Sequence, residues 1–265
     1  IIEWKNYWIK IMKKTCAKNI FMIAYYNTMN WGLILACKEL KKKCIDIQHG
    51  VISDNVIPYS NFLYKNNYVN TLPSDFFVWS KYEKTILQKN FGKLSKYSVI
   101  DHPWKVFLEK NKFNCLKEIE NNVKTISLKK EINILIAHQP VREWQNCFKP
   151  IIQIINEKKD WNFWFRLHPT NRDKLSNEIK ALKKKENVYF EIATNTPINI
   201  LFKYVDLVIT PESSISIEAS LFSLKTIFLI EHSKTTKMHL IKQGKAVFLN
   251  NKSDIVTKIY EWKKK

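Results

Sequence analysis

Short apolar runs alternate with helix-like stretches along the chain, and this alternation limits the fold more than any other feature of the sequence. Each run is bounded by polar or turn residues, as is typical of buried parallel strands. In the first part of the chain the runs lie at 20–26, 44–48, 75–79 and 97–101. The stretches between them, 27–43 and 81–90, have apolar residues at helical spacing and predict crossover helices.

The alternation starts again after a charged stretch at 111–130, which predicts a connector between two lobes. The second series predicts strands at 132–137, 161–167, 187–191, 205–209 and 225–230. Its predicted helices lie at 146–158, 172–184, 197–203, 214–222 and 252–263. We therefore predict an α/β protein with two Rossmann-like lobes, 1–110 and 131–265. The first lobe is expected to be incomplete or unusually small, because only a helix-like segment, 1–18, precedes its first strand.

The charge and the cysteines narrow the class of protein. The chain has 44 basic and 24 acidic residues, a net charge of +20, and nearly all the basic residues are lysines. Such an excess indicates either a solvated lysine-rich surface or a protein that is attracted to an anionic membrane or an acidic glycan. The five cysteines are odd in number and lack C-x-x-C spacing, which favours a reducing compartment. We expect a cytoplasmic protein, or one peripheral on the inner face of the cytoplasmic membrane.

Two further features concern membranes and phosphate loops. No apolar stretch approaches the ~20 residues that a membrane-spanning helix needs. Segment 1–18, with Trp4, Tyr7, Trp8 and Met12 among lysines, is either a contact for a membrane surface or partner, or a helix buried in the first lobe. The chain has only four glycines, so a glycine-rich phosphate loop is excluded.

Polar side chains follow four of the predicted strands, at the points where ligands bind in open α/β sheets. These segments are Gln48-His49-Gly50, His138-Gln139-Pro140, His168-Pro169-Thr170-Asn171 and Thr210-Pro211-Glu212-Ser213-Ser214. Three of the six histidines therefore lie at strand ends. Such a grouping favours a functional site over scattered surface or core histidines.

The segment after strand 205–209 predicts an anion site. Ser213 and Ser214 lie where a helix begins, so their hydroxyls and the free backbone N–H groups can bind a phosphate. Alternatively, Ser213 only caps the helix. Glu218, about one turn further on, can accept hydrogen bonds from ribose hydroxyls or be an ordinary solvated acid.

Arg166 and His168 end a strand rich in aromatic residues. Alternation along the strand places both side chains on one side, where each can donate to a diphosphate or a carboxylate. Alternatively, Arg166 pairs with an acid on a neighbouring strand.

The run Arg166-Leu167-His168-Pro169, followed by Ser213-Ser214 and Glu218-Ala219, resembles the C-terminal lobe of GT-B glycosyltransferases. It is most similar to bacterial capsule and lipopolysaccharide enzymes, including sialyltransferase-like and Kdo-transferase-like proteins and CDP-glycerol polymerases. The resemblance implies that His168, Ser213 and Ser214 bind the nucleotide and its phosphate. With them we group Arg166, Pro169, Asn171 and Glu218 as the predicted donor site. Gln48, Gly50, His138 and Glu212 are candidate donor or acceptor contacts.

Gln48-His49-Gly50 is similar to the His-Gly step of the CDP-glycerol polymerases, which implies that His49 is the general base for the acceptor hydroxyl. An imidazole that titrates near neutrality suits that role. The sialyltransferase-like families have an acidic residue just before this glycine, and His49 stands there instead. The resemblance therefore does not assign CMP-sialic acid as the donor.

The sequence as a whole predicts a metal-independent, cofactor-free glycosyltransferase of capsule or lipopolysaccharide synthesis. Its donor would be a nucleotide-activated sugar, with CMP favoured and CDP or UDP as alternatives, and its acceptor a surface glycan or glycolipid. A first alternative is a UDP-sugar 2-epimerase, which shares the two-lobed fold but relies on several acids. A second is a basic nucleic-acid-binding protein. Nucleic acid is not expected as a partner, because the aromatic residues fall largely inside predicted strands and helices, where core packing explains them.

Overall fold

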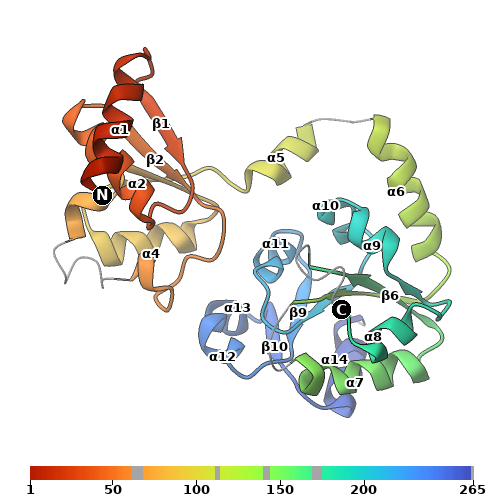
Figure 1. Cartoon of the computed structure of the whole chain (residues 1–265). Helices are drawn as coiled ribbons and strands as arrows, with labels where there is room; N and C mark the ends of the chain where they lie inside the picture. The colour runs from red at the N-terminus through yellow and green to blue at the C-terminus, as the bar shows by residue number, and fades with distance from the viewer. Residues whose placement is uncertain (61–67, 111–113, 140–143, 169–174, 264–265) are drawn as a thin grey trace. The chain divides into compact units, whose positions relative to one another are not determined.

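The structure is a computed structural model that describes residues 1–60, 68–110, 114–139, 144–168 and 175–263 (Figure 1). It divides into two compact units, Ile1–Lys110 and Asn111–Lys265. Each unit is built on one parallel β-sheet with helices packed against it. The predicted α/β fold with two Rossmann-like units is thereby confirmed.

The first unit follows the predicted order of strands and helices. Its elements are α1 (Ile2–Lys13), β1 (Asn19–Met22), α2 (Thr28–Glu39), β2 (Lys43–Ile47), the 3₁₀ turns η1 (Ile57–Tyr59) and η2 (Tyr68–Thr71), β3 (Asp75–Val78), α4 (Lys81–Phe91), β4 (Lys96–Val99) and α5 (Pro103–Lys110). Local sequence sets the helix ends. The Asn27 side chain caps α2 by accepting the N–H of Asn30 at 2.8 Å, and Ser80 caps α4 by accepting the N–H of Tyr82 at 3.1 Å. Gly92, at a φ of 57°, ends α4.

The first sheet has the strand order β1-β2-β3-β4, which places the connecting helices on one face. Right-handed crossovers that all move in the same direction across a sheet lie on the same side of it. Helices α2 and α4 accordingly share one hydrophobic core with Met22, Cys44 and Phe76. On the opposite face Phe21 is 55% exposed and contacts Phe77 at 6.2 Å between ring centroids. Among the described residues of this unit, the sheet is therefore covered on one face only.

Helix α1 packs against α2, as expected for a segment buried in this unit. Met12 is buried in the core, the Trp8 indole donates to the carbonyl of Met29, and Lys5 pairs with Glu39 at 2.5 Å. The approach is close because Gly32 of α2 has no side chain. A Cβ at Gly32 would collide with the Cβ of Trp4 and lie 2.8 Å from the backbone nitrogen of Lys5. The outer side of α1 stays exposed at Tyr7.

The second unit contains a six-stranded sheet. Its elements are α6 (Asn114–Ser127), β5 (Ile132–Ala137), α7 (Trp144–Glu157), β6 (Trp161–Arg166), α8 (Asn177–Leu182), β7 (Val188–Tyr189), α9 (Glu191–Asn195), α10 (Ile198–Phe202), β8 (Leu207–Thr210), α11 (Ile215–Leu221), β9 (Lys225–Phe228), α12 (Ser233–Thr236), α13 (Met238–Lys242), β10 (Ala246–Phe248) and α14 (Lys252–Lys263). The strand order is β10-β9-β8-β5-β6-β7, and all pairs are parallel. This is the order of a complete Rossmann sheet.

Both faces of the second sheet are buried. Alternate residues of its strands point to opposite sides, so Phe163 and Phe165 pack against α7, α8 and α14, while Trp164 packs against α6, α9 and α10. All three side chains are fully buried. The near-continuous apolar strands of this part of the sequence follow from this two-sided burial.

Two sequence predictions need correction in this unit, and one strand was missed. Helix α6 carries the fully buried Val123 and packs into the second unit, so residues 114–127 are part of its core and not a separate connector. The predicted strand 187–191 is only two residues long, because Glu191 already begins α9. Strand β10 was not predicted, since its three residues are too few to show a period.

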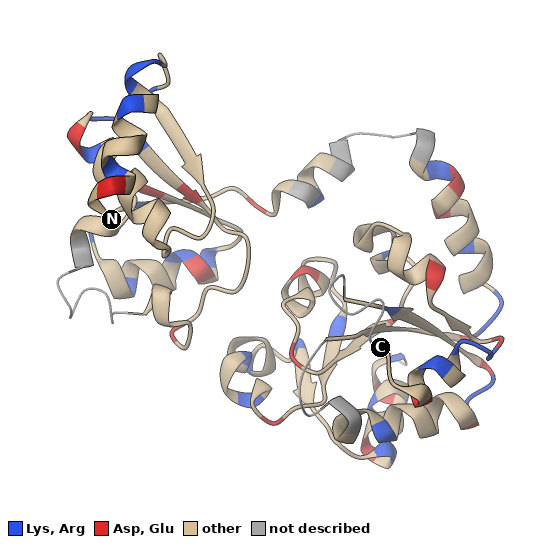
Figure 2. Ribbon diagram, in the orientation of Figure 1, with Lys and Arg blue, Asp and Glu red and all other residues tan. Residues whose placement is uncertain are grey.

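Lysine and arginine are spread over helices of both units (Figure 2). In the described part of the chain, none of the helices has the length and apolar character to cross a membrane. The charge of +20 is therefore carried by a broad surface and not by one segment.

We predict that Gly32→Ala lowers the stability of the chain, although alanine is the better helix former by about 1 kcal/mol. The new methyl group pushes α1 away from α2, and we expect a net loss of about 1–2 kcal/mol in the free energy of unfolding. Urea titration followed by tryptophan fluorescence measures it. Gly50→Ala is the matched control, because a Cβ there has no neighbour within 4 Å. Equal effects of both substitutions would contradict the packing argument.

Candidate functional site

The order of the second sheet defines where a ligand binds. The chain runs outward through β5, β6 and β7, and then crosses to the other side of β5 to form β8, β9 and β10. The direction reverses between β5 and β8, and in open α/β sheets ligands bind beyond the carboxyl ends of the strands at such a reversal. His138 and Gln139 follow β5, and the segment Pro211–Ser214 follows β8.

Hydrogen bonds join these two strand ends. The Thr210 hydroxyl donates to the carbonyl of Ala137 at 3.0 Å, and the backbone N–H of Glu212 donates to Oε1 of Gln139 at 3.0 Å. The N–H of Ser213 points to the Thr210 hydroxyl at 3.4 Å. The structure therefore brings the predicted residues of the two segments into one fixed loop pair.

Ser213 and Ser214 play different parts in this loop. The Ser213 hydroxyl accepts the N–H of Ile215 at 3.3 Å, and its carbonyl accepts the hydroxyl of Ser216 at 2.7 Å, so Ser213 shapes the start of α11. Ser214 is exposed, and its hydroxyl has no hydrogen bond within the described part of the chain. Of the two predicted phosphate contacts, Ser214 is the one that presents its hydroxyl to solvent.

Arg166 is tied to the backbone beside it. Its Nη1 donates to the carbonyls of Ala193 and Thr196, each at 2.6 Å. Burial raises the pKa of Glu218, and the neighbouring Arg166 opposes that shift. The expected grouping of Arg166 and Glu218 is thus present, with the guanidinium holding the segment 193–196 in place.

His138 and His168 lie together at the ends of the adjacent strands β5 and β6. The N–H of His138 donates to the carbonyl of Arg166 at 2.9 Å. Burial lowers the pKa of His138 to about 4, and the nearby His168 lowers it as well. His138 is therefore neutral at physiological pH and buried, while His168 is only partly buried. Pro169 and Asn171, also predicted for the donor site, lie outside the described residues.

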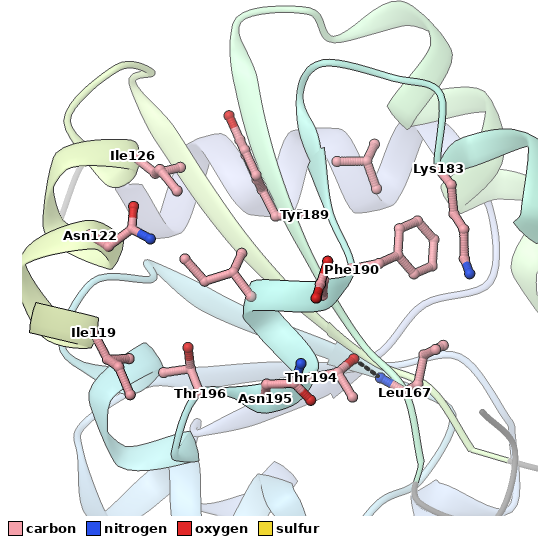
Figure 3. Close-up of a pocket in the computed structure, with 13 residues that line it drawn as sticks. Ile119, Asn122, Ile126, Leu167, Lys183, Tyr189, Phe190, Thr194, Asn195 and Thr196 are labelled. Atoms are coloured by element: carbon pink, nitrogen blue, oxygen red, sulfur yellow. Dashed lines mark hydrogen bonds between the residues drawn. The ribbon is translucent and has the colours of Figure 1, made fainter. Parts of the chain in front are cut away.

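A cavity of about 890 Å³ opens next to this strand end (Figure 3). Helix α6 forms one wall and the segment 188–196 the other, and Leu167 reaches its rim. The N–H of Leu167 donates to the Thr194 hydroxyl at 3.1 Å. Amide and hydroxyl groups of Asn122, Asn195 and Thr196 stand among its apolar lining residues. Sequence reasoning did not find this cavity, because its polar residues come from three separate segments without a motif.

A cluster after β9 was also not foreseen. Glu212 Oε2 lies 2.9 Å from Nδ1 of His232, and burial lowers the pKa of Lys237 to about 8, a shift that Glu212 opposes. Burial also lowers the pKa of His239 to about 4, with further contributions from Lys237 and Lys245. The sequence contained a signal for this cluster, because Glu231 and His232 directly follow the predicted strand 225–230.

In the first unit, the segment after β2 is held by Gln48. Its Oε1 accepts the N–H of Trp79 at 2.8 Å, and its Nε2 donates to the carbonyl of Gly50 at 2.9 Å. His49 is exposed, with Nε2 3.4 Å from the hydroxyl of Tyr26, and partial desolvation lowers the pKa of its imidazole. Gln48 therefore supports the loop, and His49 is the side chain that can reach a ligand.

A buried acid lies behind His49. Asp46 is 1% exposed, its Oδ1 accepts the N–H of Tyr25 at 3.2 Å, and burial raises the pKa of its carboxyl to about 7. Tyr25, Tyr26 and Tyr59 surround it and pack against one another. The Asp46 carboxyl is therefore protonated below about pH 7, because the three tyrosines exclude water from it.

No group of three or more metal-binding side chains occurs in the ranges that the structure describes. The possible ligands at the strand ends are chiefly imidazoles, hydroxyls and amides. They suit hydrogen bonding to an organic phosphate better than the binding of Mg²⁺, which prefers carboxylates.

The geometry defines the chain as an α/β protein with two Rossmann-like units, the fold of the GT-B type. No protein-family model matches the sequence, and no curated protein resembles it at a significant level. Solved structures do share the fold. The UDP-GlcNAc 2-epimerase of Neisseria meningitidis, solved with UDP-GlcNAc bound, is 16% identical with a TM-score of 0.68, over 98% of this chain and 73% of that one.

Two further structures are similar. The UDP-GlcNAc 2-epimerase of Methanocaldococcus jannaschii, in complex with UDP-GlcNAc and UDP, is 18% identical with a TM-score of 0.62, over 99% of this chain and 73% of that one. A variant of the wall teichoic acid polymerase TagF is 14% identical with a TM-score of 0.60, over 94% of this chain and 65% of that one. At these identities the similarity shows a common fold.

We predict that Asp46 makes the stability of the chain fall as the pH rises. Its pKa is about 7 when folded against an ordinary value of 3.8, so the folded protein binds the extra proton between these two values. The free energy of unfolding should therefore decrease from pH 4 to pH 7, by up to about 4 kcal/mol from this group. Asp46→Asn lacks this dependence and should gain stability relative to the wild type over the same range. Urea titrations at each pH test this, with the exposed Asp101→Asn as control, and parallel curves for wild type and Asp46→Asn would contradict it.

We also predict that Arg166→Met lowers the free energy of unfolding by about 2–4 kcal/mol, because two backbone carbonyls lose a charged donor. Hydrogen exchange should increase at residues 193–196 before the rest of the unit. Lys180→Met, an exposed cation on α8, is the control and should change stability by less than about 0.5 kcal/mol. Unchanged exchange at 193–196 would show that Arg166 does not hold this segment.

Proposed function

We propose that the chain is a nucleotide-sugar enzyme, and specifically a metal-independent glycosyltransferase of bacterial surface-polysaccharide synthesis. The donor binds the second unit at the carboxyl ends of β5, β6 and β8. The observation that carries this proposal is the position of the hydrogen-bonded loop pair, Ala137–Gln139 with Thr210–Ser214, at the reversal point of a complete Rossmann sheet.

The cavity next to the end of β6, which the loop pair and His168 do not line, has room and chemistry for a base and a ribose. A volume of about 890 Å³ falls in the range of about 300–1,000 Å³ that is typical of small-molecule sites. Asn122, Asn195 and Thr196 can hydrogen-bond a base or ribose in this cavity, and the Ser214 hydroxyl and His168 can donate to phosphate oxygens. Because UDP or UDP-GlcNAc is bound in two of the similar structures, we favour a uridine nucleotide over CMP or CDP.

In the transfer reaction, His49 accepts the proton of an acceptor hydroxyl while that oxygen attacks the anomeric carbon of the sugar. The bond from the anomeric carbon to the phosphate oxygen breaks, and the nucleotide leaves with the electron pair. An exposed imidazole with a lowered pKa is unprotonated near neutral pH and can act as this base. The acceptor is a glycan or glycolipid, and the cytoplasmic side of the membrane is its proposed place of action.

A 2-epimerase acting on a UDP-sugar is the second candidate, because several of the similar structures, including those from Neisseria meningitidis and Methanocaldococcus jannaschii, are UDP-GlcNAc 2-epimerases. Epimerisation at C2 removes a proton from carbon, which calls for acids and bases that reach the sugar. At the end of β2 the acid, Asp46, is 1% exposed among tyrosines, and His49 is the exposed group. At this strand end the arrangement suits transfer to a hydroxyl, whereas Glu212 and Glu218 of the donor loop are acids that an epimerase could use.

The test begins with binding. We expect UDP, among CMP, CDP, UDP and GDP without added metal, to raise the melting temperature of the full chain most. His168→Ala and Ser214→Ala should reduce the shift, because each removes a donor to the phosphate. Ser220→Ala, at the far end of the same helix, is the matched control and should keep it.

Turnover then separates the two candidates. An epimerase incubated with UDP-GlcNAc in heavy water incorporates deuterium at C2, whereas a transferase leaves C2 unlabelled and releases UDP only with an acceptor. His49→Asn should keep nucleotide binding and lose release. Failure of all four nucleotides to bind would overturn the proposed function, and C2 labelling would replace the transferase by the epimerase.

A further inference from the structure

Lys237 is a buried cation without a direct partner. The residue is 5% exposed and lies between α12 and α13, where its backbone N–H donates to the carbonyl of Ser233. In the part of the chain that the structure describes, its side chain has no hydrogen bond and no ion pair within 4 Å. The stem of the side chain is covered, whereas its Nζ keeps some access to solvent, so a dissolved anion can reach it. An ammonium so largely removed from water is costly unless an anion or several acceptors surround it. A negatively charged ligand bound next to Lys237 would compensate the charge of its ammonium.

The neighbouring titratable groups compensate this charge only in part. Glu212 is close enough to influence Lys237, but its carboxylate is engaged by His232 at 2.9 Å. On the other side lies His239, which burial keeps neutral at physiological pH, and beyond it Lys245, which adds positive charge. The local balance of formal charge is therefore positive.

The sheet places the segment that leads to Lys237 beside the donor loop. Strands β8 and β9 are parallel neighbours, and the N–H of Leu229 donates to the carbonyl of Thr210 at 3.1 Å. The residues after β9 thus lie next to those after β8, and the Glu212–His232 contact joins the two segments directly. Sequence position alone, 24 residues from Ser213, does not bring them together.

We propose that Lys237 binds the second, outer phosphate of a nucleoside diphosphate, so that the donor is a nucleoside-diphosphate sugar and not a CMP-sugar. The inference rests on the proposed function, because it places the added charge beside the same donor loop. Ser214 and His168 hold the phosphate next to the nucleoside, and Lys237 neutralises the oxygens that gain charge when the sugar leaves. A monophosphate has no group that needs this ammonium.

The test compares UDP with UMP by calorimetric titration of the full chain, in wild type and in Lys237→Met. Methionine fills the same space without charge. We expect the variant to lose about tenfold or more in affinity for UDP and little for UMP, as for the loss of a charged hydrogen bond. Lys237→Arg should retain most of the preference for UDP. The melting temperature of unliganded Lys237→Met should be unchanged or higher, because an unpaired buried charge is removed.

Lys234→Met is the matched control, since Lys234 lies three residues away but is exposed and paired with Glu231. It should leave both affinities as in the wild type. UDP binding in which Lys237→Met keeps the UDP-to-UMP ratio of the wild type overturns this inference and leaves the proposed function intact. Equal weakening of both ligands together with a lower melting temperature assigns Lys237 a structural role and also overturns it. No binding of either nucleotide to the wild type overturns both proposals.

Discussion

The burial of the second sheet on both faces is the constraint on which the rest of this unit depends. A parallel sheet needs cover on each side, and the fully buried Trp164 on one face and Phe163 and Phe165 on the other provide the surfaces that the helices cover. Because all six strands are parallel, their carboxyl ends meet at one edge, and every loop there leaves a rigid strand. The polar groups of that edge are thereby positioned by the strands themselves.

Several ionisable groups at the strand ends are removed from water to a large extent. Arg166 donates hydrogen bonds to two backbone carbonyls. Burial lowers the pKa of His138 to about 4 and raises that of Asp46 to about 7. Lys237 is 5% exposed and has no direct partner among the described residues. Each costs stability that a plain apolar core would not cost. Arg166 is compensated by its hydrogen bonds to the carbonyls of Ala193 and Thr196. Lys237 has no such hydrogen bonds among the described residues, and the proposal that it binds a phosphate rests on this difference.

Much of the fold was predictable because each signal was local. Strands 132–137 and 161–167 are long apolar runs, and the caps Asn27 and Ser80 act within three residues of their own position. The prediction failed where a signal was short or depended on distant packing. The three residues of β10 show no period, and the charges of α6 suggested a connector although Val123 packs deep in the core. Among the candidate site residues, His168 could be chosen from the sequence because it directly follows a predicted strand, and Ser214 because it lies at the start of a predicted helix.

The sequence by itself determined the α/β class, the two-unit organisation and the strand ends that carry His49, His138, His168 and Ser214, since hydrophobic periodicity and helix signals are properties of neighbouring residues. Only the tertiary structure decided which strand ends are adjacent. It joined Gln139 to Glu212, bound the Arg166 guanidinium to the carbonyl of Ala193, and brought His232 to Glu212 of the donor loop. Strand order is set by how helices and sheet bury their apolar surfaces together, and that is a property of the whole unit that no single segment contains.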